Sequence, residues 1–369
     1  MQKTTTSICA LILTIAAFFS ILEVKAQYEF NPLVELTHTS VKDQCQTGTC
    51  WSYSTSSFLE SEAARISGHI VDLSEMATVR YTYPLKADMY IRYQGKHQFG
   101  PGSLCHDVMN AVEGWGLCPQ DVYTGLKNGA IEHNHSDMDA ALLAIVNALA
   151  NKPSGNLDPN WRSTVDMILD SYIGELPTKF EYNGRSYTPE SFRDYLGIDP
   201  DNYLNLSSFT HHPFGENFIL EVPDNFSHGE FYNISIDDLQ RAVEAAVVNG
   251  YTVAWDADVS EKGFSFKHGV AILPKASEMS KLWKEVVDEQ DVTQKSRQVG
   301  FDNQSTTDDH LMHIVGLSTD QNGAKYFVIK NSWGTGNKYG GLQYVSMPYF
   351  RAKTISVLVH KDAVKRLLK

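Results

Sequence analysis

The sequence predicts an α+β fold with two lobes, because helical patterns fill its first half and strand patterns fill its second half. Apolar residues recur at helical spacing over residues 50–67, 104–115 and 137–151, and over 235–249 further on. Apolar and polar residues alternate as in strands over residues 251–258, 268–273, 310–318, 326–331, 341–345 and 354–360. A chain of 369 residues without internal repeats can build one large domain of this kind.

The first 26 residues are typical of a secretory signal peptide. Lys3 supplies a positive start, residues 8–21 are mostly apolar, and Val24 and Ala26 offer small residues before a cleavage point. The apolar run is short for a membrane-spanning helix, which disfavours a membrane anchor. We expect a mature protein that starts near Gln27, is exported to the periplasm or the extracellular space, and does not contact the membrane after cleavage.

Composition limits the class of partner. The chain has a formal net charge of −13, and an acidic protein of this kind is a poor partner for nucleic acid. From Ser277 to Phe301 the sequence is charged and helix-prone, which predicts a solvated face.

The segment from Gln44 to Trp51 carries the residues of a cysteine nucleophile. Cys50 stands at the first turn of the helix predicted over residues 50–67, where the helix dipole favours a thiolate. The amide of Gln44, six residues earlier, can donate a hydrogen bond to an oxyanion. Gly48 permits close backbone approach between the two.

A cysteine nucleophile needs a base and a residue that orients the base. His310 and Asn331, far downstream, are the candidates. His313 is an alternative base, but two residues three apart on a strand point to opposite faces, so only one of them can face Cys50.

Together these segments resemble the three active-site blocks of papain-like cysteine peptidases, in the same order. The first block runs from Val41 to Trp51, the second starts at Asp309, and the third is Asn331 to Gly334. Residues 102–112 and 258–265 further resemble the bleomycin hydrolase and aminopeptidase C branch.

The resemblance implies the papain-like fold, with a helical lobe, an antiparallel β lobe and a cleft between them. In the family pattern the base histidine follows an Asp, Asn or Thr and precedes a glycine by six positions, which favours His310 over His313. Cys50 and His310 are then expected to form an imidazolium–thiolate pair that hydrolyses peptide bonds, with Gln44 at the oxyanion and Asn331 orienting His310. No cofactor is expected.

Three departures from the plant-type papain pattern have consequences. Thr47 replaces a family cysteine, so the disulfide it forms there is expected to be absent. With Cys50 free, at most one disulfide can form among Cys45, Cys105 and Cys118, and the sequence leaves that pairing open. The short stretch from residue 27 to 43 cannot fold as an inhibitory propeptide. The peptidase domain is expected to span residues 27–369, with residues 151–231 as an insertion on its helical lobe.

The branch resemblance implies an aminopeptidase, in which the chain's own C-terminal tail lies in the cleft, and a homo-oligomer, a hexamer in that branch. An open-cleft endopeptidase, an inert papain-fold binding protein and another acyl-transfer enzyme such as a transglutaminase or amidase are the alternatives. A helical tail on the surface is the alternative for residues 359–369.

The paired histidines do not predict a metal site. His211 with His212, and His133 with His135, lack a third ligand at a suitable spacing. Solvated loop histidines are the favoured interpretation, and no Cys-x-x-Cys spacing occurs.

Overall fold

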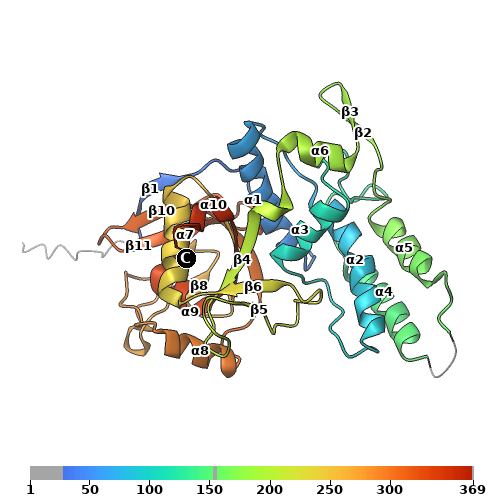
Figure 1. Cartoon of the computed structure of the whole chain (residues 1–369). Coiled ribbons are helices and arrows are strands. Elements are labelled where there is room, and N and C mark those ends of the chain that lie inside the picture. Colours follow the sequence, from blue (N-terminus) through green and yellow to red (C-terminus); the bar gives the residue numbers. More distant parts are fainter. Residues whose placement is uncertain (1–27, 153–155, 368–369) are drawn as a thin grey trace, which may run out of the picture.

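The computed structural model describes residues 28–152 and 156–367 and shows a helical lobe beside a lobe built on a large sheet (Figure 1). The predicted signal peptide, residues 1–26, lies outside the described residues. Within the described residues no helix is both long enough and apolar enough to span a membrane.

The helical lobe contains α1 to α6. The helices predicted over residues 50–67, 104–115 and 137–151 are confirmed to within one residue at each end. The first two end where predicted because Gly68 and Gly116, which follow them, have a positive φ. Ser74 caps α2 as predicted, its side chain accepting a hydrogen bond from the Ala77 N–H. The elements are α1 (Cys50–Ser67), α2 (Glu75–Arg92), α3 (Cys105–Gly114), α4 (Ser136–Ala150), α5 (Trp161–Tyr172), the hairpin β2 (Phe180–Tyr182) and β3 (Arg185–Tyr187), and α6 (Pro189–Leu196).

The other lobe is formed by one sheet in the order β5-β6-β4-β13-β7-β10-β11-β12-β9-β8, with β1 added to β10. Its pairs are antiparallel, as predicted, except for the parallel pairs β4–β6 and β9–β12. The strands are β1 (Phe30–Glu35), β4 (Tyr203–Ser207), β5 (Asn217–Ile219), β6 (Glu230–Asn233), β7 (Val253–Ala257), β8 (Phe264–Ser265), β9 (Val270–Ala271), β10 (His310–Asp320), β11 (Lys325–Lys330), β12 (Leu342–Ser346) and β13 (Thr354–His360). Around it lie α7 (Ile236–Val248), α8 (Gln294–Asp302), α9 (Met347–Lys353), α10 (Lys361–Val364) and the short 3₁₀ helices η1 (Pro200–Asn202) and η2 (Ala276–Glu278).

The segment 151–231 contributes to both lobes, which corrects its placement on the helical lobe alone. Its helices α5 and α6 pack in the helical lobe, α5 against α2 and α4. Its strands β4, β5 and β6 instead extend the main sheet, since β4 pairs with β13. Pairing between strands so far apart in sequence leaves no local signal.

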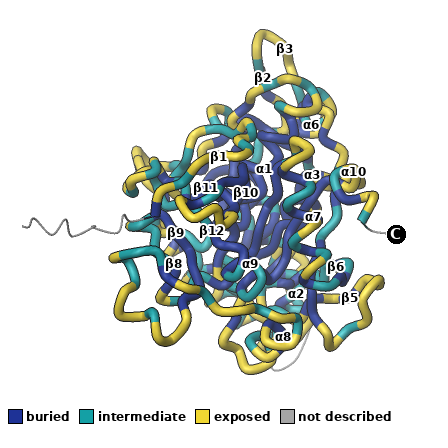
Figure 2. The backbone as a smooth tube through the Cα atoms, turned by 90° about the vertical axis from the view of Figure 1, so that its left-hand side faces the viewer, coloured by how far each residue is buried: buried dark blue, intermediate teal, exposed yellow. Residues whose placement is uncertain are grey.

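Helix α1 lies at the junction of the lobes. Residues 50–63 are all buried, and Figure 2 shows α1 among the buried strands. Two serines fix it to β10: Ser54 Oγ donates to Met312 O at 2.6 Å, and Ser57 Oγ lies 2.8 Å from His313 Nδ1. The contact sets the register of the cysteine helix against the histidine strand.

The charged segment 277–301 is only partly solvated. Arg297, in α8, is 1% exposed, and its guanidinium donates hydrogen bonds to Ser208 O and Arg351 O. The prediction of a solvated face is wrong at Arg297, whose Nε and Nη1 donate to these two carbonyls while its buried Nη2 has no hydrogen-bond partner among the described residues.

The chain's tail forms the short surface helix α10, which packs against α7. Asp362 N donates to His360 Nδ1, the His360 ring packs on Tyr251, and Arg65, in the last turn of α1, lies over the same tyrosine ring. α10 therefore lies at the opposite end of α1 from Cys50, about 22 Å away at 1.5 Å per residue. The tail as far as Leu367 is not in the cleft, which corrects the expectation from the branch resemblance.

Candidate active site

Cys50 is the first residue of α1 and is 8% exposed. A hydrogen bond from the Leu311 backbone N–H to the thiol places Cys50 beside β10, at the residue that follows His310. The close approach of the preceding loop depends on Gly48, because a Cβ there would lie 2.5 Å from the Pro101 ring. Trp51 Nε1 donates to Pro101 O at 2.9 Å and fixes the same loop.

Burial works against the predicted imidazolium–thiolate pair. It raises the pKa of Cys50 to about 12, with further increases from nearby carboxylates, and it lowers the pKa of His310 to about 4. The Leu311 N–H lowers the pKa of the thiol, and the hydrogen bond that Asn331 accepts raises the pKa of the imidazole. The N-terminus of α1 also favours the thiolate.

Asn331 fixes the tautomer of His310. The Asn331 amide is oriented by two other bonds: Ser332 N donates to its Oδ1 at 2.7 Å, and its Nδ2 donates to Gln343 Oε1 at 2.6 Å. Its Oδ1 is therefore an acceptor toward His310 Nε2, 2.8 Å away, so Nε2 carries the hydrogen. The lone pair of the neutral imidazole is then on Nδ1, which can accept a proton.

Trp333 covers this hydrogen bond. Its ring stacks on the His310 ring with centroids 4.5 Å apart. Phe264 and Phe266 pack edge-on against the outer face of the tryptophan. Aromatic cover of this kind keeps water from the imidazole.

Gln44 is tied to the asparagine segment. Gln44 N donates to Ser332 O at 2.9 Å, and Ser332 Oγ donates to Gln44 Oε1 at 2.6 Å. One hydrogen of Gln44 Nε2 goes to Thr47 O at 2.7 Å, which leaves the other available to a ligand. Gln44, His310 and Asn331 thus form one hydrogen-bonded group through Ser332. The Cys50 thiol binds the N–H of Leu311, the strand residue that follows His310.

Two residues of this group were not predicted. Ser332 follows Asn331 directly, so its place in the third block was a usable signal. Gln343 lies twelve residues from Asn331, on β12, and reaches it only because β11 and β12 pair. Its position in the sequence carries no signal of that contact.

His313 has a different environment. It is fully buried at the interface of β10 with α1, where Ser57 binds its Nδ1 and Phe58 packs edge-on to its ring. Burial holds its pKa well below the usual value. These contacts suit a residue that joins two elements.

The four described cysteines are free, so no disulfide forms among Cys45, Cys105 and Cys118, a pairing that the sequence left open. Cys105 and Cys118 are buried, and burial raises the pKa of both thiols. Neither is placed for nucleophilic chemistry.

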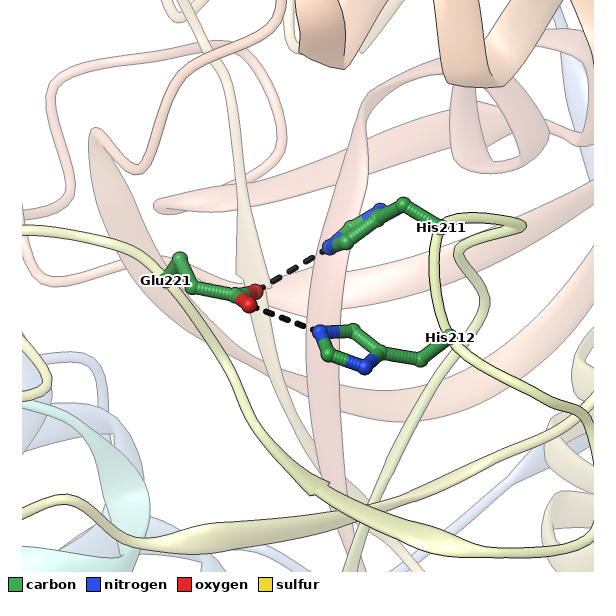
Figure 3. Close-up of side chains that lie close together, drawn as sticks. All are labelled: His211, His212 and Glu221. Atoms are coloured by element: carbon green, nitrogen blue, oxygen red, sulfur yellow. Dashed lines mark hydrogen bonds and ion pairs between the residues drawn. The ribbon is translucent and has the colours of Figure 1, made fainter.

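His211 and His212 both bind Glu221, and Figure 3 shows the two rings facing its carboxylate oxygens. The three side chains lie close enough to hold a metal ion. A metal-bound histidine, however, donates its other ring N–H to an acceptor. His211 Nδ1 instead faces the Nε2 of Gln298, an amide that Thr210 N and Asp302 hold in that orientation.

His211 Nδ1 is therefore an acceptor, and its Nε2 carries the hydrogen that Glu221 accepts. The arrangement suits a carboxylate held by two histidines better than a metal site. The carboxylates of Glu60, Asp72 and Glu75 also lie close enough to hold a metal ion. The ammonium of Lys42 occupies that position instead, 2.6 Å from Glu75 Oε1 and paired with Asp72. His133 and His135 are buried, which corrects the prediction that they are solvated, and burial lowers the pKa of both. Their rings pack edge to face, and no third ligand joins them among the described residues.

Residues 178–369 match the family described as the Peptidase C1-like family, over more than half of the chain. The chain belongs to the Peptidase C1-like family. The matched span contains His310 and Asn331, whereas Gln44 and Cys50 precede it. Membership confirms the predicted resemblance to papain-like cysteine peptidases, including the bleomycin hydrolase and aminopeptidase C branch.

Two curated relatives and one solved structure are similar to this Peptidase C1-like chain. Aminopeptidase G of Lactobacillus delbrueckii subsp. lactis is 22% identical over 367 residues, which cover 89% of this chain and 82% of the relative. Aminopeptidase W of the same organism is 24% identical over 216 residues, covering 55% and 48%. The crystal structure of PepW from Lactobacillus rhamnosis HN001 superposes with a TM-score of 0.72 at 17% identity, over 92% of this chain and 83% of that one.

The structural likeness to PepW confirms the predicted α+β fold. Membership of the Peptidase C1-like family identifies the chain as a cysteine-type peptidase.

Proposed function

We propose that the protein hydrolyses peptide bonds through Cys50, His310 and Asn331, with Gln44 at the oxyanion. The Cys50 sulfur attacks the carbonyl carbon, and its proton passes to His310 Nδ1. The free hydrogen of Gln44 Nε2 and the Cys50 N–H stabilise the oxyanion. His310 then protonates the leaving amine, and a water molecule activated by the same nitrogen hydrolyses the thioester.

The hydrogen-bonded orientation of His310 carries this proposal. A base needs an unprotonated nitrogen, and the Asn331 contact supports the proposal because it leaves Nδ1 as the unprotonated nitrogen of His310. The bond that Asn331 accepts from Ser332 N and the one that it donates to Gln343 are both buried, which holds the amide in this orientation.

Substitution of the nucleophile tests the mechanism. Cys50→Ala is expected to abolish turnover with an unchanged far-UV spectrum. In a Cys45→Ser background, which removes the free and only partly buried thiol of Cys45, it is also expected to abolish labelling by iodoacetamide at neutral pH. Cys118→Ala, which removes a buried thiol next to Ser74, is the matched control and is expected to keep activity. Residual turnover above a few per cent in Cys50→Ala contradicts the assignment, and wild-type protein whose Cys50 resists labelling supports the inert-protein alternative.

We further propose that cleavage removes single residues from free N-termini. Both curated relatives are named aminopeptidases, which supports this mode. The measurement is kcat/KM on one peptide with a free and with an acetylated N-terminus. A preference of at least tenfold for the free form is expected, and equal values favour the open-cleft endopeptidase. Incorporation of amines into a glutamine substrate would indicate a transglutaminase.

Export and assembly are also proposed, from the features of residues 1–26 and from the branch resemblance. N-terminal sequencing of protein recovered outside the cytoplasm is expected to start near Gln27. Light scattering of the purified chain is expected to give the mass of a homo-oligomer, a hexamer in the resembled branch, and a monomer contradicts that proposal.

A further inference from the structure

Residues 220–229 connect β5 to β6 in the sheet lobe and reach across to the helical lobe. The two strands pair antiparallel, with Ile219 opposite Glu230. Figure 1 shows both strands on the side of the sheet lobe that faces the helical lobe. A two-residue turn is enough to join strands paired in this way, so the pairing does not require the longer connection. We call residues 220–229 the strap.

A buried asparagine joins the two ends of the strap. Asn225 Nδ2 donates to Leu220 O at 2.9 Å and to Gly229 O at 3.1 Å, and its Oδ1 accepts from Gly229 N at 2.8 Å. A buried amide whose donors and acceptor are all used in this way fixes the shape of the backbone around it. The strap is therefore one defined structure that can bear contacts at its far end.

The far end of the strap is anchored to two helices of the other lobe. Ser227 Oγ donates to Asp107 Oδ1 at 2.6 Å and lies 2.9 Å from His106 Nε2, both in the first turn of α3. His228 Nε2 lies 2.7 Å from the hydroxyl of Tyr93, the residue that follows α2. The strap thus spans from the sheet lobe to the helical lobe.

Lys86, in α2, is a buried cation between the strap and the loop that precedes α3. Its Nζ donates to the carbonyls of Gly100 and Gly102 in that loop. The same atom lies 5.4 Å from the centre of the Phe226 ring in the strap. Burial lowers the pKa of Lys86 to about 8, against the charge of Asp224, also in the strap, which raises it. One side chain therefore holds both segments in place.

The loop that precedes α3 connects the strap to the cysteine segment. Trp51 Nε1 donates to Pro101 O at 2.9 Å, and a Cβ on Gly48 would lie 2.5 Å from the Pro101 ring. On the next residue, a Cβ on Gly102 would lie 1.9 Å from Asp224 Oδ2. The strap therefore rests on a loop that itself packs on the residues on either side of the proposed nucleophile.

The strap also forms part of the wall of a cavity of about 820 Å³. Residues 221–224 line it together with Gln98, whose Nε2 donates to Asp224 Oδ1 at 2.7 Å. The sheet lobe contributes residues between 301 and 308, and residue 308 precedes His310 by two positions. The strap and the cavity are thus bounded by segments that lead directly to both reacting groups.

We propose that the strap closes one end of the substrate cleft and limits how many substrate residues can lie on the amino side of the cleaved bond. The inference rests on the proposed aminopeptidase function and deepens it, because a closed end admits the free end of a peptide and excludes an internal segment. A peptide that continued through this end would have to break the hydrogen bonds of the strap to Asp107, Tyr93 and Gln98.

The principal test shortens the strap. Replacement of residues 221–228 by the dipeptide Asn-Gly keeps Leu220 and Gly229 and supplies a type I′ turn, so β5 and β6 can still pair. The substrates have a free N-terminus and one to four residues before a fluorogenic amide, so that the initial rate reports one bond. For wild type, kcat/KM is expected to fall at least about tenfold beyond one residue. For the shortened enzyme it is expected to be nearly independent of length.

Ser227→Ala is the second variant, and it leaves the chain length unchanged. It removes the contacts of the strap with Asp107 and His106. We expect kcat/KM on the four-residue substrate to rise at least about threefold, with the one-residue substrate unaffected. Ser171→Ala, which removes an exposed hydroxyl that donates to Ile168 O in α5, is the matched control and is expected to keep the wild-type length dependence.

The outcomes separate the strap from the proposed function. A length limit that persists in both strap variants overturns the closing role and leaves the strap as a brace between the lobes. A wild type without a length limit overturns it as well. Equal cleavage of free and acetylated one-residue substrates by wild type contradicts the aminopeptidase proposal instead, and the length series then still decides on the strap. A fall of kcat on the one-residue substrate in both variants would show that the strap acts on the catalytic loop and not on length.

Discussion

Replacement of Asn331 by alanine tests the geometry of the base most directly. The amide makes three buried hydrogen bonds of 2.6, 2.7 and 2.8 Å, to Gln343, Ser332 N and His310. At about 1 kcal/mol for each bond, the variant is expected to lose about 3 kcal/mol of unfolding free energy.

The same substitution is also expected to lower kcat, independently of its effect on the unfolding free energy. Without the acceptor, the His310 ring can turn and its tautomer is no longer fixed, and a misplacement of about 1 Å costs about 100-fold in rate. We expect kcat to fall about 100-fold in Asn331→Ala with KM little changed. Steady-state kinetics below the unfolding transition, together with urea unfolding, measure both effects.

Gln343→Ala supplies the graded comparison. It removes only the acceptor of Asn331 Nδ2, so the bond that Asn331 Oδ1 accepts from His310 remains and the loss of kcat is expected to be smaller. An Asn331→Ala enzyme with kcat within a few-fold of wild type would refute the argument that this amide fixes the base. So would a larger loss for Gln343→Ala than for Asn331→Ala.

His310→Ala is expected to remove almost all activity, whereas His313→Ala is expected mainly to lower stability through the lost contact with Ser57; reversed results would assign the base to the other histidine. Lys42→Met removes one of the two lysines, Lys42 and Lys330, whose charges lower the pKa of the buried Glu60, a pKa that burial raises to about 7. A buried carboxyl whose pKa is raised by folding destabilises the protein once it ionises, so stability is lost as pH rises from about 4.3 through the folded pKa. Urea unfolding of the variant should therefore show a cost of about 3–5 kcal/mol at pH 8 and a smaller cost at pH 5. Deletion of residues 367–369 is expected to leave the ratio of free to acetylated cleavage unchanged, and a gain of acetylated cleavage would restore a role for the tail.

Local signals predicted the first helix of the site well. Gly68 ends α1 where expected, and Cys50 begins it, because a glycine with positive φ and a change of period are both visible in the sequence. Contacts made across the sheet were not visible. β4 joins β13, and Gln343 reaches Asn331, only after distant strands pair.

Charge balance was equally hidden in the sequence. Asp224 and Asp308 are 84 residues apart, and neither stands in a pattern that distinguishes it from the many other acidic residues. Only the folded chain shows that Asp224 lies near the buried Lys86 and that Asp308 lies against the buried Asp256. For the same reason the burial that opposes the imidazolium–thiolate pair could not be anticipated from residue types.

The two serines that join α1 to β10 have a consequence for engineering this enzyme. Ser54 and Ser57 hold the cysteine helix to the histidine strand well inside the protein, so the distance between sulfur and imidazole does not depend on the surface loops. The cavity walls at residues 221–224 and 301–308 belong to other segments. Substrate choice can therefore be redesigned by exchanging these loops, while the reacting groups keep their alignment.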